Sequence, residues 1–197
     1  MIQEQPKWCY KPVEVPNLIE IQEELKKILY VKQPSFDEMT VPNIFYVPVK
    51  RDEIESTCPL YTKYIESTGL LDRWEFSLLS IIVGNKPERS EKGIHIDTAN
   101  WQYRCYGLNL PIINCEGTYT VWYEGTLNDN PVDTSIQRLQ SAKFLRTDLP
   151  HHEIARIESC NPAWVNVTIP HVPINMHGKP RAAISARFTP EVHEYFV

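Results

Sequence analysis

The second half of the chain reads as a succession of short β-strands, and this pattern limits the fold more than any other feature. From residue 76 onward, short apolar or alternating segments are separated by turn residues. Closely spaced strands of this kind are typical of a sandwich or jelly roll, so we expect a mainly β fold with flanking helices. The expected strands are Phe76–Val83, His95–Asp97, Tyr103–Ile113, Tyr119–Tyr123, Ser141–Leu145, His152–Ile157, Trp164–Ile169 and Arg181–Phe188.

Helical patterns are confined to the first part of the chain. Residues 18–29 place apolar side chains at helical spacing, and Asn17 is a suitable N-cap for them. A second helix is expected over residues 59–67, ending before Gly69. Between the two helices, Ile44–Val49 has the composition of a strand.

The length suits one domain with a substantial core. With 197 residues, 42% of them hydrophobic and 23% charged, the chain has the balance of a globular protein. We expect a single domain over residues 1–197, in which residues 1–75 support a β core formed by residues 76–189. Sixteen prolines against seven glycines favour short elements joined by rigid turns.

Charge and cysteine content exclude several functional classes. The formal net charge is −5 and no basic cluster is present, so binding to nucleic acid or to an anionic membrane surface is not expected. No apolar run is long enough to span a bilayer, and no signal peptide is recognisable. Five cysteines without CxxC spacing favour reduced thiols, and hence a cytoplasmic location.

One set of polar residues in this β region indicates a metal site. His95 and Asp97 stand two positions apart on an expected strand, so both side chains point to the same face. His171 follows 74 positions after Asp97, and Arg181 follows His171 by ten. Two imidazoles and one carboxylate leave coordination positions open, which suits non-haem Fe(II) and oxygen chemistry. An arginine nearby is suited to binding a carboxylate.

The combination resembles the Fe(II)- and 2-oxoglutarate-dependent oxygenases, chiefly their aspartyl and prolyl hydroxylase-like branches. Their pattern is HxD, a distal histidine and an arginine about ten residues later, on a double-stranded β-helix of the jelly-roll or cupin-like kind. Here the matching residues are His95, Asp97, His171 and Arg181, and the resemblance covers residues 76–189.

The resemblance implies an enzyme, a dioxygenase. Its metal would be Fe(II), bound by the two histidines and Asp97, and its co-substrates would be 2-oxoglutarate and O2. The far carboxylate of 2-oxoglutarate would bind Arg181. Halogenating relatives lack the carboxylate ligand, so the presence of Asp97 favours hydroxylation or a related oxidation. The substrate would be a protein side chain or a small molecule.

Two alternatives concern the ligands themselves. His177 and Arg187 are also ten positions apart, but His177 lies in a segment that reads as a turn, which favours His171. Arg181 and Arg187 are separated by an even number of residues, so both point to one face of the last strand. The arginine nearer the metal should bind the co-substrate, and the other would form an ion pair or contact substrate.

Further candidates would complete the co-substrate site. The family often has Ser or Thr two positions after the arginine, where this chain has Ala183. Another hydroxyl must then contribute, and the candidates are Ser185, Tyr119 and Thr120. Asn109 is either a co-substrate ligand or a buried amide satisfied by the protein.

Two other interpretations of the whole chain stay open: a non-catalytic jelly-roll binding or assembly protein, and a cupin-type metalloenzyme without a keto acid. Residues 124–140 are polar and rich in turn residues, which suggests a lid over the site. Trp101 and Tyr103 are candidates for the rim of the substrate opening.

Overall fold

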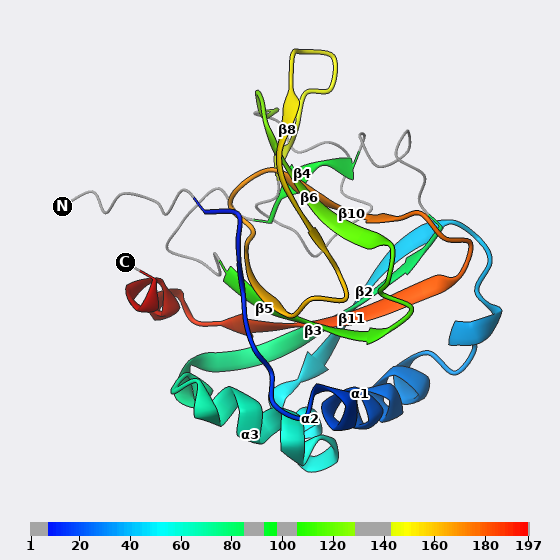
Figure 1. Cartoon of the computed structure of the whole chain (residues 1–197), viewed down its shortest axis with the longest axis vertical. Coiled ribbons are helices and arrows are strands. Elements are labelled where there is room, and N and C mark those ends of the chain that lie inside the picture. Colours follow the sequence, from blue (N-terminus) through cyan, green and yellow to red (C-terminus); the bar gives the residue numbers. More distant parts are fainter. Residues whose placement is uncertain (1–7, 85–92, 98–105, 129–142, 197) are drawn as a thin grey trace.

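Two antiparallel β-sheets face each other, and a layer of helices covers the outer face of the larger sheet (Figure 1). The computed structural model describes residues 8–84, 93–97, 106–128 and 143–196. Among these residues, no helix has the length and apolar character needed to cross a membrane.

The larger sheet has six strands in the order β1-β9-β5-β11-β3-β2. Strand β11 lies at its centre, paired with β3 on one side and with β5 on the other. Side chains of β5 and β11 are buried at nearly every position, as expected for strands that are covered on both faces of the sheet. The strand bounds are Tyr10–Pro12 (β1), Asn43–Lys50 (β2), Trp74–Val83 (β3), Tyr106–Ile113 (β5), Ala163–Asn166 (β9) and Pro180–Phe188 (β11).

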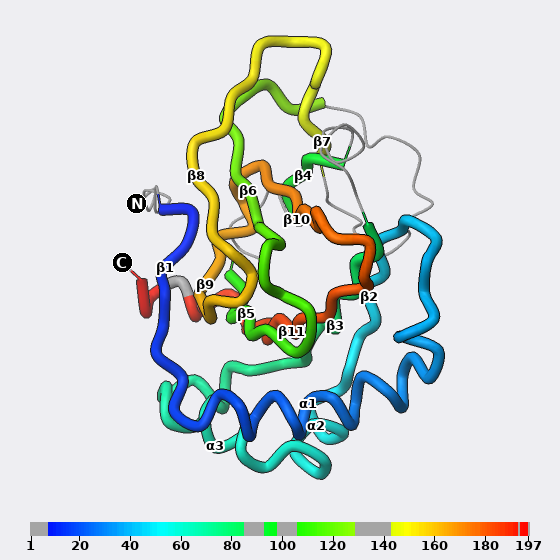
Figure 2. Tube along the Cα trace, turned by 45° about the vertical axis from the view of Figure 1, so that its right-hand side comes forward, coloured from blue at the N-terminus to red at the C-terminus, as the bar shows by residue number. Residues whose placement is uncertain are grey.

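The smaller sheet has five strands in the order β7-β4-β10-β6-β8. Its strands lie across from the larger sheet (Figure 2). The strand bounds are His95–Ile96 (β4), Thr118–Glu124 (β6), Lys143–Phe144 (β7), His152–Glu158 (β8) and His171–Asn175 (β10).

Helices α1 (Leu18–Lys32), α2 (Arg51–Thr57) and α3 (Pro59–Ser67) pack against the larger sheet. Their apolar faces and the outward side chains of β3, β5 and β11 form the main hydrophobic core. Burial of this apolar surface is the principal stabilising contribution expected for such a layer. Short 3-10 helices occupy Phe36–Glu38, Leu71–Arg73 and Pro190–Tyr195.

Strand β11 separates this core from the interior between the sheets. All nine of its residues are buried. Ala182, Ile184 and Ala186 belong to the core under the helices. Since side chains alternate along a strand, Arg181 and Arg187 point to the opposite face, into the space between the sheets.

The expected mainly β fold with flanking helices is confirmed. The helix predicted over residues 18–29 forms and continues to Lys32, and Gly69 adopts a positive φ of 74° after α3. Asn17 is the N-cap residue of α1, as predicted, but it is in a left-handed conformation and its side chain makes no capping hydrogen bond.

Several elements differ from those predicted. The strand expected at Trp164–Ile169 ends at Asn166, and the next strand, β10, begins at His171 itself. Helix α2 and the short strand β1 were not predicted. The expected rim residues Trp101 and Tyr103, and residues 129–140 of the suggested lid, lie outside the described residues.

Candidate metal centre

Three side chains converge at one end of the interior between the sheets. One potential ligand atom from each of His95, Asp97 and His171 lies within 4.8 Å of the other two. His95 is on β4, and Asp97 follows that strand directly; His171 opens the neighbouring strand β10. In the register of the sheet, His95 and His171 are directly opposite each other. This pairing brings together residues that are 76 positions apart in the sequence.

Both imidazoles are oriented by the backbone. His95 Nδ1 lies 2.7 Å from the carbonyl oxygen of Gly93, and His171 Nδ1 lies 2.9 Å from that of Ile169. A carbonyl oxygen accepts a hydrogen bond, so each Nδ1 carries a proton. In the neutral imidazole Nε2 then presents its lone pair, and in the protonated form Nε2–H can donate to Asp97. These Nε2 atoms lie 3.2 Å and 3.7 Å from the same oxygen, Asp97 Oδ1. Such outer contacts fix the tautomer that a metal-binding histidine needs.

The second oxygen of Asp97 is held by an arginine. Arg187 Nη2 lies 3.0 Å from Asp97 Oδ2, and both side chains are largely buried. One carboxylate oxygen therefore faces the two histidines, while the other accepts a charge-assisted hydrogen bond.

The surroundings shift the pKa values of the three candidate ligands in different directions. Burial raises the pKa of Asp97, but Arg187 and the hydrogen bond with His95 outweigh burial and hold it below its usual range. Burial also dominates at His171 and lowers its pKa to about 4. Burial disfavours the charged form of His95 too, yet its shorter contact with Asp97 raises the pKa overall. A neutral imidazole and an ionised carboxylate are the forms that bind a metal.

The sequence candidates Arg181 and Arg187 both lie on the inner face of β11, as predicted. They occupy different ends of it: Arg187 contacts Asp97, whereas Arg181 Nη1 lies 3.4 Å from Ser80 Oγ on β3. Arg187 is thus the arginine nearer the candidate ligands, but it is already engaged in an ion pair, against the expectation that the nearer arginine would serve a co-substrate. The Nε atoms of both arginines are buried without a hydrogen-bond partner. Two buried guanidinium groups with unused donors fit an anionic ligand in this interior.

Asn109 and Ser185 are brought together between the two arginines. They are directly paired in the register of β5 and β11, so their side chains share one face. Asn109 Oδ1 and Ser185 Oγ are buried, and neither has a hydrogen-bond partner. Both predicted polar residues thus lie in the interior, with capacity left for a ligand.

The two other hydroxyl candidates, Thr120 and Tyr119, are adjacent on β6 and therefore point in opposite directions. Thr120 lines a small hollow next to Arg181 and Asn109. Tyr119 packs instead on the outer face of the smaller sheet, near Val121 and Arg156. The structure thus places Tyr119 away from the interior, against its candidacy as a co-substrate ligand.

His177, the rival to His171, lies in the segment between β10 and β11 and is exposed. Its backbone N–H donates to Asn175 Oδ1, and its imidazole lies against Gly117. The described histidines and acidic residues form a cluster suited to a metal only at His95, Asp97 and His171.

Tyr46 is a residue of the interior that sequence reasoning missed. Tyr46 lies on β2, opposite Ser80 on β3. Burial raises the pKa of its hydroxyl to about 12, and the nearby Asp97 contributes in the same direction. The composition of Ile44–Val49 correctly predicted a strand. It could not predict that Tyr46 would lie near the charged groups, because this position depends on the pairing of β2 with β3.

Gly107 is a second residue without a sequence signal. It is opposite Arg187 in the register, and a Cβ atom there would come within 2.5 Å of Ser185 Oγ and 3.4 Å of Arg187 Nη1. Glycine at this position leaves room for the Ser185 hydroxyl, beside the Arg187 guanidinium group.

No model of a protein family and no curated protein matches the sequence. Among solved structures, a prolyl-4-hydroxylase from Pseudomonas putida is 10% identical; the match covers 93% of each chain, with a TM-score of 0.51. The epimerase SnoN, in complex with Fe3+, alpha ketoglutarate and nogalamycin RO, is 14% identical over 91% of this chain and 78% of its own, with a TM-score of 0.46. YcfD of E. coli is 15% identical at a TM-score of 0.42; the match covers 78% of this chain but only 36% of YcfD.

The similarity to the prolyl-4-hydroxylase extends over nearly the whole of both chains. It shows that this chain shares the fold of that prolyl-4-hydroxylase, here a jelly roll of two facing antiparallel sheets. At 10% identity it shows the fold alone, so activity must be argued from the site.

Proposed function

We propose that the protein is an Fe(II)- and 2-oxoglutarate-dependent oxygenase, and specifically a hydroxylase. The observation that carries this proposal is the convergence of His95, Asp97 and His171, with ligand atoms within 4.8 Å of one another. Two neutral imidazoles and one carboxylate form the facial ligand set that suits non-haem Fe(II). With 2-oxoglutarate, bound iron would supply activated O2, inserting one oxygen atom into a substrate C–H bond while the keto acid is oxidised to succinate and CO2.

The chain's own residues would first hold the iron. Both Nε2 atoms and Asp97 Oδ1 already face one another, so little rearrangement of these side chains is required. Arg187 holds Oδ2 and so keeps the carboxylate from turning. This would leave one oxygen as the ligand and the remaining metal positions open.

The same interior has the chemistry to bind a dicarboxylate. Arg181 is 97% buried and would pair with the carboxylate that is farther from the metal. Asn109 and Ser185, with unused hydrogen-bonding capacity, would contact the ligand between the two ends. Between the arginines, Ala183 and Ser185 are the inward residues of β11, and both are small.

An anaerobic titration tests this proposal. Protein loaded with Fe(II) is titrated with 2-oxoglutarate while the weak visible absorption band of the chelated keto acid is followed. We expect the band in the natural protein, no band in His95→Ala, and a weakened affinity in Arg181→Met. His152→Ala is the matched control, because His152 is an exposed histidine outside the triad.

The outcomes separate the remaining interpretations. Iron binding without keto-acid binding would support a cupin-type metalloenzyme. If the natural protein binds neither iron nor 2-oxoglutarate, the result would favour a non-catalytic jelly-roll protein. If binding is found, release of CO2 from the labelled 1-carboxylate under O2 then shows whether the bound keto acid is turned over.

A further inference from the structure

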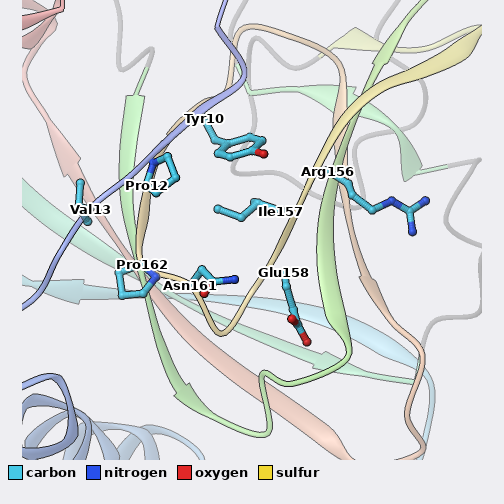
Figure 3. A pocket seen from close by; sticks show the side chains of 8 residues that line it. All are labelled: Tyr10, Pro12, Val13, Arg156, Ile157, Glu158, Asn161 and Pro162. Carbon is cyan, nitrogen blue, oxygen red and sulfur yellow. The ribbon is translucent and has the colours of Figure 1, made fainter.

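The edges of the two sheets leave an open seam on one side of the molecule. Among the residues that the structure describes, strand β1 ends the larger sheet and pairs with β9 alone, while β8 ends the smaller sheet and pairs with β6 alone. Between them lies a surface hollow of about 400 Å³ (Figure 3). Its lining residues are Tyr10, Pro12, Val13, Arg156, Ile157, Glu158, Asn161 and Pro162.

A second, smaller hollow lies behind the first. Its volume is about 10 Å³, which is room for roughly one water molecule. Residues from both sheets line it, including Arg181, Asn109 and Thr120. Ile157 and Asn161 line both hollows, so these two residues form the wall between the surface and the interior.

The inner hollow is polar and its polar groups are not satisfied. Asn109 Oδ1, Ser159 Oγ and Arg181 Nε are all buried without a hydrogen-bond partner. Leaving such groups unpaired costs about 1–3 kcal/mol each, and more for a charged group. A water molecule in this space, or a carboxylate group that enters it when the wall opens, would therefore be stabilised.

The wall is built from parts that can move. Asn161 is exposed and lies in the turn between β8 and β9. Ile157 belongs to an edge strand, and its side chain points into the seam together with that of Tyr10 (Figure 3). Edge strands and turns open locally at a lower free energy than the central strands of a sheet.

We propose that the β1/β8 seam is an exchange route for small anions between solvent and the Arg181 end of the interior, with Ile157 and Asn161 as its gate. The identification of the anion as 2-oxoglutarate, and of the departing product as succinate, rests on the proposed function. None of the three metal-site residues lines either hollow. An anion could therefore be exchanged through the seam while a substrate stays bound near His95, Asp97 and His171.

The kinetics of keto-acid binding test the gate. Asn161→Trp places a large side chain in the mouth of the seam, and Asn161→Ala is the matched control that removes the amide without blocking. In stopped-flow mixing of the anaerobic Fe(II) protein with 2-oxoglutarate, we expect Asn161→Trp to slow association and dissociation at least tenfold. The Kd should be unchanged, because a gate alters both rates equally. Unchanged rates, or a changed Kd with an unchanged association rate, would overturn the proposal.

A second experiment tests the route without iron or keto acid. Ala183 lines the inner hollow, so an Ala183→Cys variant places a reporter thiol behind the gate. Its alkylation by iodoacetate is followed by peptide mass, which separates this thiol from the natural cysteines. We expect Asn161→Trp to slow the alkylation at least tenfold relative to Asn161→Ala. Equal rates would exclude the seam as the route. If natural protein binds no 2-oxoglutarate but the alkylation is gated, the proposed function fails and the route remains.

Discussion

Arg187 and Asp97 form a buried ion pair that joins the two sheets at the metal end of the interior. Arg187 lies on the central strand of the larger sheet, and Asp97 directly follows β4 of the smaller one. The distance of 3.0 Å from Nη2 to Oδ2 places a full positive charge beside the only carboxylate of the metal triad. The pair therefore has two consequences, one for stability and one for the orientation of a ligand.

Removal of this arginine should destabilise the metal-free protein. Arg187→Met leaves the largely buried Asp97 carboxylate without its cationic partner, and breaking a buried pair in this way costs about 3 kcal/mol. Urea unfolding of the metal-free protein measures the change. Asp97→Asn and the double variant complete a double-mutant cycle, in which we expect the double variant to be more stable than the sum of the single effects. Strictly additive effects would show that the pair contributes nothing to stability.

Replacement of His171 should abolish metal binding, whereas replacement of His177 should not. His171→Ala removes one of three converging ligand atoms, while His177 is exposed between β10 and β11. We expect at least a hundredfold loss of Fe(II) affinity for His171→Ala, measured by competition with a chelator. Far-ultraviolet circular dichroism should be unchanged in both variants. Stoichiometric iron in His171→Ala would contradict the assignment.

Asn109 and Tyr119 should differ in their effect on keto-acid binding, because they point to opposite sides of the sheets. Asn109→Ala removes a buried amide between the arginines, and a lost hydrogen bond of about 1 kcal/mol corresponds to a fivefold to tenfold higher Kd for 2-oxoglutarate. Tyr119→Phe removes a hydroxyl on the outer face and should leave the Kd unchanged. The anaerobic titration measures both, and an effect confined to Tyr119→Phe would reverse the assignment.

The thiol of Cys58 should make the fold sensitive to alkaline pH. Burial, followed by the nearby Glu24, raises the pKa of Cys58 from 9.0 to about 12. A pKa raised in the folded state gives stability that is complete below pH 9 and is lost as pH rises toward 12. Within this window the thiol accounts for up to about a tenfold fall in the folding equilibrium constant per pH unit. Urea unfolding between pH 8 and 11 should show a shallower loss for Cys58→Ala than for the natural protein, and parallel curves would contradict this.

The sequence predicted His95, Asp97 and His171 as one set of ligands, and the structure brings their side chains together, although their binding of a metal stays a prediction. His95 and Asp97 share a face through strand periodicity alone, and His171 follows directly on an apolar segment. The fold class followed from the strand-rich pattern of residues 76–188. In contrast, β10 was missed because Pro170 and Pro173 flank His171 and interrupt a strand-like pattern.

The rest of the interior depends on pairing between distant strands, which one sequence does not encode locally. Tyr46 lies near the charged groups because β2 pairs with β3, and Gly107 leaves room for Ser185 because β5 pairs with β11. Tyr119 and Thr120 were equal candidates until the register decided which of them points inward. A pattern of period two identifies two faces but does not say which one is the interior.

Strand β11 has core side chains on one face and both arginines on the other. It can therefore pair with its neighbouring strands in only one register. A shift by a single residue would move Arg181 and Arg187 under the helices and turn Ile184 toward the metal. Insertion or deletion of one residue within Pro180–Phe188 would therefore remove the hydrophobic core and the anion-binding groups together. This strand can change by substitution, but not in length.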